Sequence, residues 1–134
     1  MKPSHQTMTH FYEHLGKVFY SIAAIDKSIR KEEIEKLKQI IQTEWLPLEN
    51  SFNEFGDDTA YEIEIVFDWL VANQWDFDSV LSDFKIFRNE HQSLFTPAVN
   101  ALILKTANAI ATSFSGKNKS EHVLISQLSS ILFQ

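Results

Sequence analysis

The chain has 134 residues, of which 44% are hydrophobic and 13% aromatic, enough to bury the core of a single domain. The absence of cysteine excludes disulfides, thiolate catalysis and cysteine-bearing zinc sites, and the three glycines and three prolines favour helices over a turn-rich β protein. The net charge of −6 is unevenly spread, because residues 39–84 hold eleven acidic side chains and no Lys or Arg, which disfavours nucleic acid as a partner.

The first predicted helix covers Thr9–Ile25, and residues 1–8 are expected to be a frayed N-terminus of the single domain 1–134. Apolar residues recur in it at spacings of three and four, namely Phe11, Leu15, Val18, Ile22 and Ile25. Gly16 lies within this pattern and predicts a close helix crossing. The second predicted helix covers Lys31–Trp45, and Pro47 is expected to end or kink it.

The third predicted helix, Thr59–Asn73, has two apolar stripes and is therefore expected to be the central helix. The stripes consist of Ile63, Val66, Phe67 and Leu70 on one side, and of Tyr61, Ile65 and Trp69 on the other. The helical spacing of the aromatic residues Tyr61, Trp69 and Trp75 favours packing in the core over an aromatic surface.

Three further helices complete the predicted fold. They cover Asp78–Asn89, Pro97–Ser113 with Thr96 as N-cap, and Lys119–Phe133. No stretch alternates as a strand would. The sequence thus predicts an all-α, compact single-domain bundle of about six to seven helices.

The two ends of the chain show a weak internal repeat with an offset of 88 residues. Lys31 then aligns with Lys119, Glu33 with Glu121, and in both copies a helix is followed by a polar turn and a Glu in the first turn of the next helix. The repeat is interpreted either as two pseudo-repeated helical hairpins or as two ordinary hairpins that match by chance.

The segment IAAIDKSIRKEEIEKL, residues 22–37, resembles the signature of TerB-like domains, a helical family named for tellurite resistance. The family's Asp-Gly is Asp26-Lys27 here. The resemblance implies an all-α module linked to stress response or membrane-associated complexes, more often a binding module than a catalyst. It also implies a site for a divalent cation, Ca²⁺ or Mg²⁺, held by Asp26, Glu33 and Glu121. The alternative for Asp26 and Glu33 is helix capping and turn stabilisation.

A second candidate metal site is His10-x-x-Glu13-His14, which fits the H-x-x-E-H pattern of some zinc peptidases. His10 and His14 lie one turn apart on one helix face, and Glu13 would act as the base on a zinc-bound water. Such a site also needs a third ligand and a cleft, so the hydrolase is kept as the alternative to a non-enzymatic function, with no catalytic or cofactor-binding residue assigned.

The acidic middle third is interpreted either as a solvated face or as a surface that dimerises or docks a basic partner. An unidentified protein partner and a monomer or homodimer are therefore expected. The short apolar runs and an N-terminal sequence without an apolar signal core predict a cytoplasmic protein without a transmembrane segment.

Overall fold

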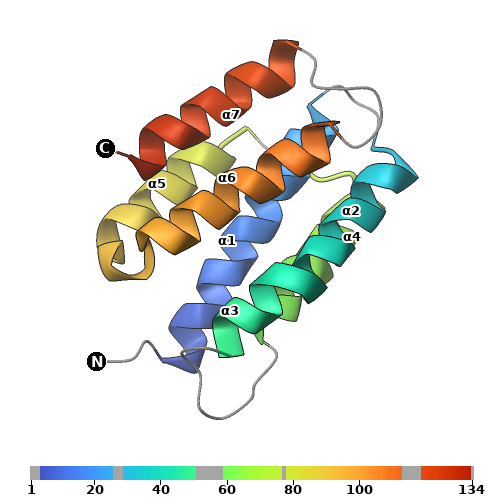
Figure 1. Cartoon of the computed structure of the whole chain (residues 1–134). Coiled ribbons are helices and arrows are strands. Elements are labelled where there is room, and N and C mark those ends of the chain that lie inside the picture. Colours follow the sequence, from blue (N-terminus) through green and yellow to red (C-terminus); the bar gives the residue numbers. More distant parts are fainter. Residues whose placement is uncertain (1–3, 26–28, 51–58, 77, 113–118, 134) are drawn as a thin grey trace.

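The computed structural model describes residues 4–25, 29–50, 59–76, 78–112 and 119–133, and in these ranges the chain is helical and contains no strand (Figure 1). The all-α prediction is therefore confirmed. The helices are α1 (His5–Ala24), α2 (Lys31–Ile40), α3 (Leu46–Asn50), α4 (Glu62–Asn73), α5 (Val80–Glu90), α6 (Pro97–Thr112) and α7 (Lys119–Leu132). A π-helical turn covers Ile41–Trp45, and 3₁₀ turns cover Thr59–Tyr61 and Gln92–Leu94.

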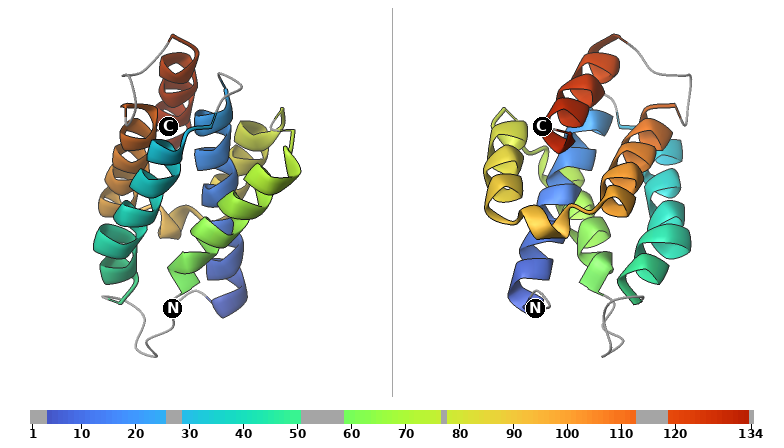
Figure 2. Two further views of the ribbon diagram at one scale, coloured as in Figure 1. Left: turned by 90° about the vertical axis from the view of Figure 1, so that its right-hand side faces the viewer. Right: turned by 60° about the vertical axis from the view of Figure 1, so that its left-hand side comes forward.

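Helix α1 lies in the interior of the bundle and contacts α4, α5, α6 and α7 (Figures 1 and 2). It can do so because apolar or small side chains surround it on most sides, and residues such as Leu15, Phe19 and Ile22 are fully buried. The helix begins at His5, earlier than expected, because the side chain of Ser4 accepts a hydrogen bond of 3.1 Å from the Thr7 N–H.

The close crossing predicted at Gly16 is found between α1 and α4. A Cβ atom placed on Gly16 would lie 3.0 Å from the carbonyl oxygen of Ile63 and 3.0 Å from Cβ of Val66. Two backbones that approach this closely leave no room for a side chain. The prediction from the sequence is confirmed at this position.

Of the two outcomes expected at Pro47, an end of the second helix is wrong, because α2, the π-helical turn and α3 follow one another without a break from Lys31 to Asn50. Instead, the π-helical turn interrupts the regular α-helix just before Pro47. In the turn, the N–H of Leu46 donates to the carbonyl of Ile41, five residues earlier. A proline has no N–H and its ring clashes with the carbonyl four residues before it in a regular α-helix. The wider π turn directly before Pro47 accommodates both effects.

The prediction that the third helix is central is also wrong. Its first stripe does face the core, since Ile63, Phe67 and Leu70 are buried in α4. Its second stripe does not, because Ile65 and Trp69 are exposed. Helix α4 therefore lies on the outside of the bundle, against α1, and ends where Gln74 adopts a left-handed backbone conformation with φ of 48°.

Candidate functional site

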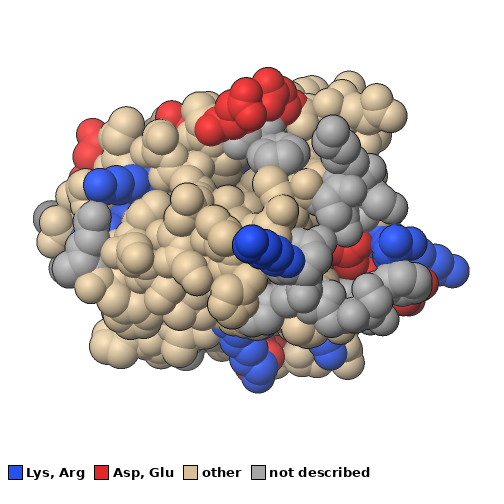
Figure 3. Space-filling view, turned by 90° about the horizontal axis from the view of Figure 1, so that it is seen from above, with Lys and Arg blue, Asp and Glu red and all other residues tan. Residues whose placement is uncertain are grey.

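The predicted acidic site involves the end of the bundle where α1 and α6 end and α2 and α7 begin (Figure 1). Seen from this end, much of the visible surface is uncharged, and the acidic and basic side chains are scattered over it without forming one cluster (Figure 3). Asp26 lies outside the described residues. Glu33 and Glu121 both lie in the first turn of their helices, and they are 4% and 3% exposed.

Glu33 has a defined structural role at the start of α2. Its Oε1 accepts a hydrogen bond of 2.8 Å from the N–H of Arg30, the residue before the helix. This contact satisfies a backbone donor at the helix start and places a carboxylate at the positive end of the helix dipole. The capping interpretation of Glu33 is therefore confirmed, and a capping carboxylate keeps a second oxygen for other contacts.

The described residues do not by themselves complete a metal site at this end or elsewhere. Within the described ranges, no group of three His, Asp or Glu side chains is arranged to hold a metal ion. Helix α6 packs against both α2 and α7, and lies between them in Figure 1. A site built on Glu33 and Glu121 would thus depend on Asp26 and its surroundings.

The two histidines of the H-x-x-E-H pattern lie in different environments, and within the described part of the chain only His14 packs against another ring. His10 is exposed, whereas the ring of His14 is half-buried and lies 4.6 Å from the ring of Phe87, measured between centroids. The ring of His91, the residue after α5, lies 4.4 Å from the ring of the same phenylalanine, measured between centroids. Burial, followed by the positive charge of Lys17, lowers the pKa of His14 to about 4. His14 is therefore neutral at pH 7.

A third buried carboxylate, Glu49 on α3, was missed in the sequence. Its Oε1 accepts a hydrogen bond of 3.0 Å from the N–H of Ala60, so it ties α3 to the 3₁₀ turn that precedes α4. Burial and then the nearby Glu49 carboxylate, which accepts a hydrogen bond from the hydroxyl, raise the pKa of Tyr12 on α1. The polar composition around residue 49 gave no signal of this burial, because the predicted second helix ends at Trp45, whereas Glu49 lies on α3.

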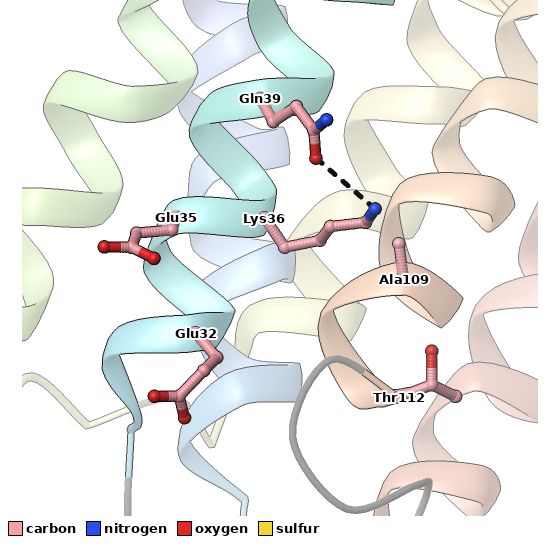
Figure 4. A pocket seen from close by; sticks show the side chains of 6 residues that line it. All are labelled: Glu32, Glu35, Lys36, Gln39, Ala109 and Thr112. Atoms are coloured by element: carbon pink, nitrogen blue, oxygen red, sulfur yellow. Dashed lines mark hydrogen bonds between the residues drawn. The ribbon is translucent and has the colours of Figure 1, made fainter.

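A shallow groove of about 400 Å³ lies between α2 and α6 (Figure 4). Lys36 extends from α2 toward α6, and its Nζ atom lies 3.4 Å from Oε1 of Gln39. The carboxylates of Glu32 and Glu35 point away from Ala109 on the facing helix (Figure 4). The groove is open and its charged groups do not converge, so its geometry does not define a catalytic site.

The most distinctive surface feature is the outer side of α4. Ile65 and Trp69, one helical turn apart, are 58% and 57% exposed, and Ala72 continues the same stripe. We call Ile65, Trp69 and Ala72 the α4 face. Large exposed apolar side chains that adjoin one another mark interaction surfaces more often than scattered single ones do.

Carboxylates border the α4 face on both sides, as the helical spacing requires. On one side, Glu64 and Asp68 lie 3.6 and 3.7 Å from Nζ of Lys38 on α2, so two carboxylates share one cation. On the other side lies Glu62, in the first turn of α4. The sequence showed both the stripe and the acidic residues, but the predicted core position of Trp69 was wrong. Tyr61 and Trp75 do pack against the core.

Comparisons with protein-family models, with curated proteins and with solved structures found no match for this chain. Among the described residues, no helix is both long enough and apolar enough to cross a membrane.

Proposed function

We propose that this protein is a non-enzymatic interaction module of the TerB-like helical type, which binds a protein partner through the α4 face. The observation that carries this proposal is the exposure of Ile65 and Trp69 side by side on one helix. Tryptophan is the residue most enriched at the energetic centres of protein interfaces, because it buries a large area and loses little side-chain entropy.

The buried side and the exposed side of α4 have different roles. The apolar stripe on the outer side of α4 is not needed for the core, which Ile63, Phe67 and Leu70 already fill from the opposite side of the helix. A face that leaves an indole in water costs free energy that contact with a partner would recover. The α4 face is therefore best explained as a surface that becomes covered.

Selection from a random peptide library displayed on phage tests this proposal. Peptides are expected to be enriched on the unmodified protein and on the control Ile86→Ser, which removes an exposed apolar side chain of α5. The double variant Ile65→Ser/Trp69→Ser should lose them. No enrichment, or equal enrichment on the double variant, would contradict docking at this face.

A second candidate function is the binding of Ca²⁺ or Mg²⁺ by Asp26, Glu33 and Glu121. It is supported by the burial of Glu33 and Glu121 in the first turns of two helices that start at the same end of the bundle. Millimolar cation is expected to raise the melting temperature, and Asp26→Asn should remove the shift while the exposed control Asp78→Asn keeps it. No shift, or a shift that Asp26→Asn retains, would exclude this site.

A further inference from the structure

We propose that the occupant of the α4 face is a basic amphipathic helix, an inference that rests on the docking function proposed above. Ile65 and Trp69 are spaced four residues apart on a helix. A partner helix laid along α4 can place apolar residues at the same spacing against them, in the manner of helix–helix packing. The shape of the face thus suits a helix better than an extended strand, since α4 offers no free backbone edge.

The charges around the α4 face determine the sign of the charge that a partner should carry. Glu62 lies on one side, and on the other side Glu64 and Asp68 share the single ammonium group of Lys38. No Lys or Arg occurs in residues 39–84, so the sequence around α4 supplies no further cation. Lys or Arg residues that flank the apolar stripe of a partner helix would meet carboxylates on both sides.

The same charges argue against a second copy of the protein, a nucleic acid or an anionic lipid surface as the occupant of the α4 face. A second copy that pairs through the same face would bring each set of carboxylates against its equivalent, and like charges in an interface are unfavourable. Nucleic acids and anionic lipid surfaces are repelled for the same reason. A basic helix is the partner that meets both the apolar stripe and its acidic borders.

Two synthetic 18-residue peptides test the proposal by calorimetric titration. In both peptides, Leu occupies positions a, d and e of a helical heptad. The remaining positions are Lys in one peptide and Glu in the other. The Lys peptide is expected to bind at least tenfold more tightly than the Glu peptide, to gain helical circular dichroism on binding, and to bind more weakly at 0.5 M than at 0.05 M NaCl.

Matched variants connect the binding to the face. Trp69→Ala should lower the affinity for the Lys peptide at least tenfold, whereas the control Ile86→Ser should leave this affinity unchanged. Charge reversal by Glu62→Lys/Asp68→Lys should lower the affinity for the Lys peptide and raise the affinity for the Glu peptide. Thermal unfolding of each variant confirms that the fold is retained.

The outcomes separate the two proposals. If both peptides bind equally well and lose affinity with Trp69→Ala, the docking function stands and the basic partner is wrong. Binding of the Lys peptide without a gain of helix would also contradict the proposal that the partner is a helix. If the protein instead associates with itself, and Trp69→Ala abolishes this in light scattering, the occupant is a second copy. If neither peptide binds, and the library selection also fails, both proposals are wrong.

Discussion

Gly16 shows how much depends on a single missing side chain where two helices cross. Its position within the buried face of α1 brings the backbone of α4 close enough that a Cβ atom would contact the Ile63 carbonyl and Val66. A backbone carbonyl moves only if the whole helix moves. The contact between α1 and α4 is the most extensive between any two helices in the described residues, so its spacing affects the whole core.

Gly16→Ala is therefore expected to destabilise the protein by about 1–2 kcal/mol. The extra methyl forces α4 outward, and this cost exceeds the gain of up to about 1 kcal/mol in helix propensity. Urea unfolding measures the difference. Adding Val66→Ala to Gly16→Ala should restore part of the stability that Gly16→Ala loses, relative to the single variant Val66→Ala. An increase in stability on Gly16→Ala alone would contradict the close crossing.

At the scale of an element, α4 shows where reasoning from periodicity stops. The sequence predicted the helix and its inner residues correctly, because Ile63, Phe67 and Leu70 follow the helical period and are buried. A second apolar stripe has the same period whether it faces a neighbouring helix or a binding partner. The sequence therefore could not distinguish a central helix from an outer helix with a docking face, and Trp69 was assigned to the wrong environment.

The two sides of α4 should respond very differently to substitution. Phe67→Ala is expected to cost about 3–5 kcal/mol because it leaves a cavity in the core. Ile65→Ser and Trp69→Ser should each change stability by less than about 0.5 kcal/mol, since these side chains are mostly in water. Thermal or urea unfolding of the three variants provides the comparison. A large loss with Trp69→Ser would mean that α4 is packed on both sides.

At the scale of the whole molecule, His14 links the stability of the bundle to pH. Its ring lies between α1 and α5, where burial and Lys17 lower its pKa, with smaller contributions from His10 and His91 in the same direction and from Asp83 in the opposite direction. The unfolded chain takes up a proton near pH 6.5, and the folded protein only near pH 4. Stability should therefore fall as the pH decreases from about 6.5 to 4.

We expect His14 to contribute about 1 kcal/mol to this loss, less than the full pKa difference implies, because the half-buried ring is partly screened by solvent. Urea unfolding between pH 4 and 7 measures the slope. His14→Gln, which cannot titrate, should show a flatter profile than the unmodified protein, while the exposed control His10→Gln should not. Equal slopes for all three proteins would show that His14 is not the group responsible.

The fold was more predictable than the candidate site, for a physical reason. Burial of apolar stripes sets the helices and leaves a periodic signal in the sequence. A docking face leaves the same signal as a core face, and buried polar groups such as Glu49 leave none, because their environment depends on contacts between distant segments. Only Glu33, whose role is local to the start of α2, could be interpreted from its neighbours in the sequence.

The π-helical turn before Pro47 also explains why Glu49 is buried at all. Glu33, Leu37, Ile41, Trp45 and Glu49 follow one another at intervals of four, and all are buried. In a regular helix each such step rotates the side chain by about 40°, so Glu49 would point roughly 160° away from Glu33. The turn acts as a one-residue insertion that takes back about 100° of this rotation. Deletion of the exposed Gln42 together with Pro47→Ala would then leave Trp45 and Glu49 facing inward on an ordinary helix.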